Sequence, residues 1–221
     1  MAKGDKWGDH YTRRARDEKW LARSVFKLEE IDRRFKLIRY GHRLLDLGCS
    51  PCSWSQYSIK RIGPKGEVVG VDLRKPDRFS ASNFRFIKAD ILTLDAQWLA
   101  GQVSPRDAVL SDLAPQTTGI KHADTNRSME LGQKAFEISL VLLKEKGHFL
   151  CKVFEGEDLK AFREEFTKYF DEIHLIRPSA VRKGSREVYL LGLGLGGRYK
   201  KLSDLNPIHP RAKHGHSSRF S

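Results

Sequence analysis

The sequence predicts an α/β domain with a mostly parallel, seven-stranded sheet and helices on both faces. Short apolar runs alternate along the chain with amphipathic segments, which is the pattern of strands joined by crossover helices. Three successive apolar runs end in or near an aspartate, and a tight turn follows the first of them. With 221 residues, the chain is long enough for one such domain with a full core.

The first strand and its turn form the centre of the prediction. The strand covers Arg43–Leu47 and carries Asp46, and it breaks at Gly48. After a Ser-Pro step, Ser53 opens an amphipathic helix that continues to Ile62. A turn of this kind presents backbone N–H groups and a helix N-terminus to a ligand at the carboxyl edge of a parallel sheet.

The next two predicted strands, Glu67–Asp72 and Asn83–Asp90, also end in acids. Asp72 is well placed to bind both ribose hydroxyls of a nucleotide-like cofactor, and Asp90 to take the amino group of its adenine. A dinucleotide site would need the G-x-G-x-x-G pattern, but Gly48 is the one glycine of the turn. S-adenosylmethionine (SAM) has no pyrophosphate and needs fewer glycines, so SAM is the favoured ligand.

Four more strands complete the predicted sheet: Asp107–Asp112, His148–Val153, Glu172–Arg177 and Glu187–Gly194. We expect a long helix from Asp124 or Thr125 to about Lys146 with Gly147 as its stop, and another after Asp158. Lys152 lies in an otherwise apolar strand, where a lysine is costly unless it is paired or used.

The N-terminal part of the chain is basic. Residues 1–16 resemble a polar arm whose Trp7 and Tyr11 either stack on bases or belong to a disordered terminus. Trp20, Ser24 and an apolar stripe at Leu28, Ile31 and Phe35 then predict a helix. Lys27 lies beside that stripe, where a lysine is usually a snorkelling side chain.

We therefore divide the chain into a basic arm (residues 1–22), a catalytic domain (23–195) and a basic, flexible tail (196–221). A histidine pair in the tail, His214 and His216, is more often solvated than metal-binding, and we predict no metal site. The basic loop with Arg182, Lys183 and Arg186 is expected to be exposed.

Charge is concentrated at the two ends of the chain. Residues 1–43 contain 13 Lys/Arg against 7 Asp/Glu, and residues 177–221 contain 10 against 2, whereas the middle is close to neutral. This distribution suits a polyanion that lies across both ends, although a solubilising surface charge is the simpler alternative. A mean hydropathy of −0.53, no apolar run of membrane-spanning length, no secretory signal and an odd number of cysteines, three, predict a soluble cytoplasmic protein.

Together these pieces resemble the FtsJ (RrmJ-type) family of SAM-dependent RNA 2′-O-ribose methyltransferases. The matching segments run in the family's order: Tyr11-x-x-Arg14, Arg23–Leu28, Leu45–Gln56, Gly70–Asp72, Asp90-Ile91, Ser111–Pro115, Cys151–Phe154 and Ser185–Tyr189. The resemblance implies the Rossmann-like fold of class I SAM-dependent methyltransferases, with SAM as cofactor and RNA as substrate.

By this resemblance, a catalytic Lys-Asp-Lys-Glu tetrad falls on Lys27, Asp112, Lys152 and Glu187. The cofactor contacts fall on Gly48, Cys52, Trp54, Asp72, Asp90 and Asp112. One departure is clear, because Cys52-Ser53 stands where the family usually has Gly-Gly before the tryptophan. Cys49 and Cys52 also form a C-x-x-C, but the further ligands or the thioredoxin context that a zinc or redox site needs are not visible in the sequence.

The expected reaction is attack of a ribose 2′-hydroxyl on the methyl group of SAM. Lys152 would accept or polarise the hydroxyl proton, and the basic arm, the helix with Lys27 and the basic loop would bracket the RNA. We expect a monomer acting on a uridine of large-subunit ribosomal RNA. The alternatives are a methyltransferase for the tRNA anticodon loop, a non-catalytic ribosome-assembly factor and a small-molecule methyltransferase.

Overall fold

The computed structural model describes residues 6–103 and 105–196, with side chains from His10 onward. Seven strands form one sheet in the order β3-β2-β1-β4-β5-β7-β6. The strands are β1 (Arg43–Leu47), β2 (Glu67–Asp72), β3 (Phe84–Lys88), β4 (Arg106–Ser111), β5 (Leu143–Phe154), β6 (Phe170–Ile176) and β7 (Glu187–Leu195). The helices are α1 (Lys6–Asp17), α2 (Val25–Phe35), α3 (Ser53–Ile62), α4 (Ala96–Val103), α5 (Lys121–Leu142) and α6 (Leu159–Phe166).

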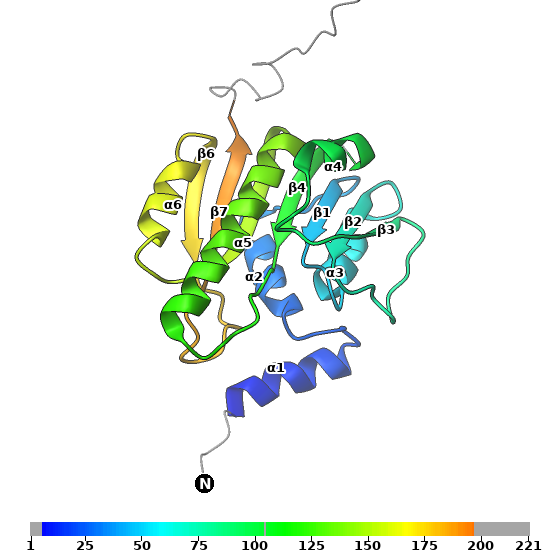
Figure 1. The fold of residues 1–221 in the computed structure, drawn as a ribbon. Helices are drawn as coiled ribbons and strands as arrows, with labels where there is room; N and C mark the ends of the chain where they lie inside the picture. The colour runs from blue at the N-terminus through cyan, green and yellow to red at the C-terminus, as the bar shows by residue number, and fades with distance from the viewer. Residues whose placement is uncertain (1–5, 104, 197–221) are drawn as a thin grey trace, which may run out of the picture.

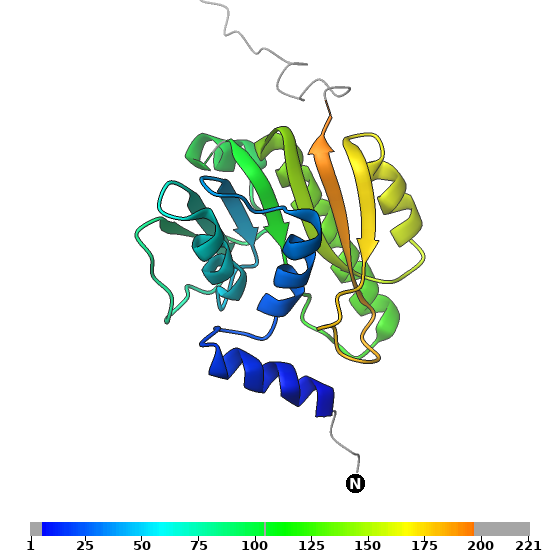
Figure 2. The same cartoon turned by 180° about the vertical axis from the view of Figure 1, so that it is seen from behind.

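The sheet lies between two helical layers. Helices α4, α5 and α6 cover one face (Figure 1), and α2 and α3 cover the other (Figure 2). Alternate residues of each central strand point into two hydrophobic cores, one on each side of the sheet, as expected for strands buried on both faces. In β1, Leu45 and Leu47 pack toward α4 and α5, whereas Leu44 packs toward α2 and α3. This confirms the predicted α/β fold with helices on both faces.

The carboxyl ends of the parallel strands form one edge of the sheet, and the predicted site residues lie along it. Strands β1 to β5 are parallel, and β7 runs antiparallel between β5 and β6. Because of this reversal, Glu187 at the start of β7 lies opposite Phe154 at the end of β5. Helix α1 lies beside the same edge, well separated from the end of β7 (Figure 1). The basic N-terminal segment is thus next to the strand tips that carry the predicted acids.

Several elements differ from the sequence expectation. Residues 6–17 form α1 and residues 96–103 form α4, and neither helix was predicted. Helix α2 begins at Val25, so Trp20 and Ser24 precede it. The long helix was wrong at both ends: α5 begins at Lys121 and ends at Leu142, where β5 already begins.

Asp124 explains why the predicted start of the long helix was wrong. It lies in the first turn of α5 and accepts hydrogen bonds from the backbone N–H groups of Thr118 and Gly119, at 2.7 and 3.2 Å. The carboxylate therefore fastens the preceding loop onto the helix instead of standing before the helix as its N-cap. Trp7, His214 and His216, which the sequence analysis singled out, lie outside the side chains that the structure describes.

A buried carboxylate joins α2 to α3. Asp32 is fully buried and accepts hydrogen bonds from the backbone N–H of Ile38 at 2.8 Å, the hydroxyl of Tyr57 at 2.8 Å and the guanidinium of Arg61 at 3.1 Å. A buried charge is tolerated when it is paired and hydrogen-bonded in this way. The contact holds the helix that carries Lys27 against the helix that follows the glycine turn.

Candidate active site

The four residues of the predicted tetrad come together at the carboxyl edge as two ion pairs. The ammonium of Lys27, on α2, contacts Glu187 at the start of β7. The ammonium of Lys152, on β5, lies 3.1 Å from a carboxylate oxygen of Asp112 and donates a hydrogen bond to the Asp112 carbonyl at 2.7 Å. All four side chains are between 6 and 16% exposed. Residues up to 160 positions apart therefore meet in one site.

A fifth residue, Tyr189, connects the two pairs. Its hydroxyl oxygen lies 2.8 Å from a carboxylate oxygen of Asp112 and 2.7 Å from one of Glu187. Because a phenol carries one proton, it donates to one of these carboxylates at a time. The sequence analysis quoted Tyr189 within a family motif but gave it no role. The available signal was its spacing, since a side chain two residues after Glu187 points to the same face of β7.

The protonation states of this cluster follow from its charges. Burial opposes ionisation of Asp112, but the ammonium groups of Lys152 and Lys27 and a hydrogen bond from Tyr189 outweigh it, so the pKa of Asp112 is below its usual value. Burial and the two neighbouring carboxylates raise the pKa of Tyr189 well above its usual value. At neutral pH, Asp112 is therefore a carboxylate and Tyr189 a neutral phenol.

The glycine turn after β1 is held in an unusual backbone conformation. Gly48 has φ +77°, and a Cβ atom there would lie 2.7 Å from the side chain of Leu113. Cys52 has φ +78° and precedes α3, so a residue with a Cβ occupies a left-handed position that favours glycine. Cys52 is fully buried and Ser53 nearly so, so neither side chain projects into solvent. The departure from Gly-Gly therefore adds a Cβ atom at two buried positions of the turn.

The C-x-x-C thiols are structural in their surroundings. Cys49 is 4% exposed, and a hydrogen bond with the Cys52 thiol together with burial raises the pKa of the Cys49 thiol. A thiol of this kind is neither a reactive nucleophile nor a ready metal ligand. Within the described part of the chain there is no group of three or more His, Cys, Asp or Glu side chains suited to a metal ion.

The chemistry of the strand tips fits SAM. Asp72 accepts hydrogen bonds from the backbone N–H groups of Ser50 and Arg74, at 2.9 and 2.8 Å, which ties the glycine turn to β2. Asp90 lies two residues beyond β3 and is exposed. Leu73 and Leu92, which are 59 and 42% exposed, follow these two tips. Two carboxylates with adjacent apolar side chains suit the hydroxyls, amino group and ring of an adenosine.

Asp46 is buried next to these acids. It accepts a hydrogen bond from the Ser55 hydroxyl at 2.6 Å, and its other oxygen has no hydrogen-bond partner among the described residues. Burial raises the pKa of Asp46 to about 7, and the negative charges of Asp112 and Asp72 add to the effect. Asp46 thus lies close enough to Asp112 of the tetrad and to Asp72, the predicted ribose ligand, to interact electrostatically with both.

Trp54, the remaining predicted cofactor contact, has an inward-pointing side chain. It is 2% exposed and donates a hydrogen bond from its indole N–H to the carbonyl of Ser24 at 2.9 Å. Its ring also packs against Tyr189, with centroids 5.8 Å apart. A contact of Trp54 with a cofactor would therefore have to come from its main chain, at the start of α3.

The basic loop between β6 and β7 is held by hydrogen bonds to the chain before α2, to α2 itself and to the start of α5. Arg23 donates to the carbonyl of Ala180 at 2.8 Å, and the backbone N–H of Ser179 donates to Glu30 at 2.8 Å. Arg186 donates to the carbonyl of Lys121, at the start of α5, at 3.0 Å. Arg186 is thus engaged with Lys121 of α5, whereas Arg182 and Lys183 are exposed on this loop.

Comparison with known proteins places this geometry in context. The FtsJ-like methyltransferase family matches residues 20–195. A Bdellovibrio bacteriovorus protein named ribosomal RNA large subunit methyltransferase E is 47% identical over 188 residues, which cover 84% of this chain and 95% of that relative. A protein of the same name from Borreliella afzelii is 42% identical over 188 residues, covering 85 and 98%.

Solved structures agree with the fold. A Plasmodium falciparum protein described as a ribosomal RNA methyltransferase superposes with a TM-score of 0.72 at 25% identity, covering 81% of this chain and all of that one. Aeropyrum pernix fibrillarin, solved with bound SAM, has a TM-score of 0.52 at 16% identity and covers 71 and 68% of the two chains. The second likeness bears on the fold alone.

Proposed function

The chain belongs to the FtsJ-like methyltransferase family, and on that basis we propose that it transfers the methyl group of SAM to a ribose 2′-hydroxyl of ribosomal RNA. The proposed target lies in large-subunit RNA, because relatives 38–47% identical over most of the chain are named as large-subunit ribosomal RNA methyltransferases. Within that RNA we propose a uridine as the methylated nucleoside. A 2′-hydroxyl distinguishes RNA from DNA as substrate.

The observation that carries this proposal is the convergence of Lys27, Asp112, Lys152 and Glu187 at one sheet edge. Two lysines and two acids that are paired and nearly buried are expensive to maintain for stability alone. They lie at the carboxyl ends of the strands, where ligands of open α/β sheets bind. Asp46 connects them electrostatically with Asp72, the predicted ribose ligand.

In the proposed reaction, bound SAM supplies a methyl group on a positively charged sulfur, so the methyl carbon is already electrophilic. As a bond forms from the 2′-oxygen to this carbon, the carbon–sulfur bond breaks and its electron pair goes to sulfur. The hydroxyl proton passes to Lys152, which can accept it only as a neutral amine and so must first release its own ammonium proton to solvent. Asp112 holds Lys152 through both its carboxylate and its carbonyl. This fixed position supplies much of the rate, since orientation alone is worth several kcal/mol.

The surface beside the site suits an RNA backbone. Helix α1 carries Arg13, Arg14 and Arg16 next to the carboxyl edge, and the anchored loop presents Arg182 and Lys183. Affinity should therefore fall steeply with salt, because arginine and lysine contacts with phosphates release bound counterions.

The test is methyl transfer from tritiated SAM to large ribosomal subunits, free ribosomal RNA and tRNA in parallel, with the product nucleoside identified after digestion. We expect a 2′-O-methylated uridine in large-subunit RNA. Lys152→Ala should abolish transfer and retain SAM binding, whereas Lys160→Ala, an exposed lysine on α6, should behave as wild type. Label found in tRNA, or full activity of Lys152→Ala, would contradict the proposal.

The proposal includes a monomeric enzyme of the cytoplasm. All three cysteines are free and buried, which suits a reducing compartment. No helix in the described residues is long and apolar enough to cross a membrane. Sedimentation of the purified chain tests the oligomeric state.

A further inference from the structure

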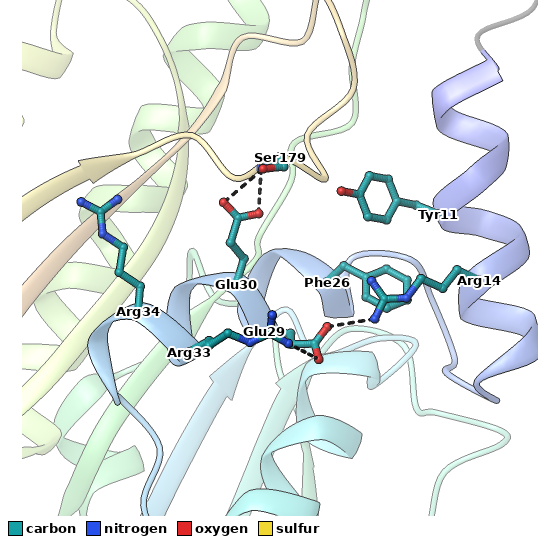
Figure 3. A pocket seen from close by; sticks show the side chains of 8 residues that line it. All are labelled: Tyr11, Arg14, Phe26, Glu29, Glu30, Arg33, Arg34 and Ser179. Carbon is teal, nitrogen blue, oxygen red and sulfur yellow. Dashed lines mark hydrogen bonds and ion pairs between the residues drawn. The ribbon is translucent and has the colours of Figure 1, made fainter.

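A cavity of about 430 Å³ lies between α1, α2 and the loop before β7 (Figure 3). It is separate from the tetrad but close to it, because Phe26 lines the cavity and the next residue, Lys27, belongs to the tetrad. Its volume is in the range of small-molecule sites. The other residues that matter here are Tyr11, Arg14, Glu30, Arg33 and Arg34.

One wall of the cavity is a fixed guanidinium plane. The Arg14 guanidinium lies 4.2 Å from the centre of the Phe26 ring and forms an ion pair with Glu29 at 3.6 Å (Figure 3). A second ion pair, with Glu18 at 2.6 Å, also holds it there. Its side chain is still 40% exposed. Because Phe26 covers one face of the guanidinium, a flat ligand stacks on the other. Unpaired RNA bases bind proteins in this way, on arginine planes and aromatic rings.

Hydrogen-bonding groups line the side opposite this plane. Glu30 points toward Ser179 (Figure 3) and accepts hydrogen bonds from its backbone N–H at 2.8 Å and from its hydroxyl at 3.4 Å. A carboxylate has about four acceptor sites, so it retains capacity for the amino or imino N–H of a base. The hydroxyl of Tyr11 points toward the same part of the cavity (Figure 3).

Two exposed arginines line the rim of the cavity. The side chain of Arg33 is 75% exposed and pairs with Glu29 at 3.4 Å, whereas that of Arg34 is exposed with its guanidinium 4.9 Å from the ring of Phe35. Exposed guanidinium groups are preferred partners of phosphates. The cavity thus combines a stacking plane, acceptors for a base and cations for a phosphate. An acidic peptide would leave the stacking plane unused and would meet Glu29 and Glu30.

We propose that this cavity is a second nucleotide subsite, which takes an unpaired nucleotide of the RNA that flanks the methylated one. This proposal rests on the proposed function. It places the target ribose at the side of α2 that carries Lys27 and the flanking base at the side of α2 that faces Arg14 of α1. The subsite selects RNA in which at least one neighbour of the target is unstacked.

The test measures binding of a fluorescein-labelled, single-stranded heptaribonucleotide to the full chain at several salt concentrations. Arg14→Lys keeps the charge but removes the plane, so it should weaken binding about tenfold, as expected for loss of one stacked base, with an unchanged salt slope. Arg34→Gln should lower the slope of log K against log[salt] by about 0.7, the value for one phosphate contact of a single strand. Arg163→Gln, an exposed arginine on α6 at the opposite face of the sheet, is the matched control and should change neither quantity.

Methyl transfer provides the second readout. Arg34→Gln should raise the KM for RNA and leave kcat and the KM for SAM unchanged. Variants that bind and react like Arg163→Gln overturn the subsite, as does an acidic peptide that displaces the oligonucleotide from the wild type but not from Arg34→Gln. If the proposed function fails, the wild type itself does not methylate ribosomal RNA, whereas failure of the subsite leaves wild-type activity intact. Thermal melting of each variant separates loss of binding from loss of folding.

Discussion

Replacement of Asp46 by asparagine should remove a pH dependence of stability that the wild type has between about pH 4 and pH 7. The folded protein raises the pKa of Asp46 to about 7, chiefly by burial, whereas an unfolded aspartate titrates near 3.9. Between these values the folded state binds one more proton than the unfolded state. The free energy of unfolding therefore falls as the pH rises through this range.

The size of the effect follows from the shift. A difference of about three pH units at about 1.4 kcal/mol each gives a loss of about 4 kcal/mol from pH 4 to pH 8, as an order of magnitude. An asparagine side chain cannot ionise, so Asp46→Asn should be more stable than the wild type by several kcal/mol at pH 8 and should lose this advantage as the pH falls toward 4. Burial also lowers the pKa of His42 and of His148. Both histidines are present in both proteins, so their contribution cancels in the difference.

The assay is urea denaturation at half-unit steps from pH 4 to pH 8, with the difference in unfolding free energy between variant and wild type plotted against pH. Asp77→Asn is a suitable control, because Asp77 is exposed. A difference curve that stays flat would refute the reasoning, since it would mean that Asp46 is ionised in the folded protein throughout. Such a result would require a proton donor for its second oxygen.

Three further predictions concern single side chains. Tyr189→Phe removes the hydroxyl that lies between the carboxylates of Asp112 and Glu187. Methyl transfer should slow more than tenfold, while SAM affinity, measured by calorimetry, should stay within a few-fold of the wild type. Unchanged turnover would show that this hydroxyl has no role in the site. Gly48→Ala should lower stability by about 1–2 kcal/mol, because a Cβ atom is strained at φ +77° and meets Leu113 at 2.7 Å, and the same variant should bind SAM more weakly; a wild-type melting temperature would argue against the strain. Asp32→Ala leaves three donors without their acceptor and should cost about 3 kcal/mol in urea denaturation, which a loss below about 1 kcal/mol would contradict.

The central strands were predictable because burial on both faces leaves a clear apolar run. The ends of β1 and β2 agree with the sequence prediction residue for residue. Helix α4 has two buried residues, Leu99 and Val103, and so offered too little periodicity to be recognised. Helix α1 is polar on most of its surface, but Ala15 is buried and Tyr11 and Arg14 contact the ring of Phe26. Trp7, Tyr11 and Ala15 recur every four residues in the sequence, but a stripe of three positions in a basic segment was too short to be recognised as a helix.

The candidate site was predictable to different depths. Acids at successive strand tips follow from the rule that parallel strands end at one edge, so Asp72 and Asp90 could be found from the residues themselves. Lys27 could not, because a lysine beside an apolar stripe is usually a snorkelling side chain. Its pairing with Glu187 depends on the reversal of β7, which short-range patterns do not encode. The role of Tyr189 was hidden for a similar reason, because an aromatic residue in an apolar strand looks like a core residue.

The geometry also narrows which group of the site accepts the hydroxyl proton. Asp112 has a pKa below its usual value, so it is a weak base that holds no proton near neutral pH. Tyr189 has a raised pKa and keeps its own proton. Both lysines are paired with a carboxylate, Lys27 with Glu187 and Lys152 with Asp112. We propose Lys152 as the acceptor once it is neutral, because Asp112 holds it in place through both a carboxylate and a carbonyl oxygen. Lys152→Arg tests this assignment, because an arginine keeps the charge and the contacts but cannot accept a proton. If the amine accepts the proton, Lys152→Arg should bind SAM and RNA normally but transfer no methyl group at any pH up to about 10. Recovery of activity at high pH would instead show that solvent hydroxide takes the proton and that positioning of the hydroxyl is the larger contribution of Lys152.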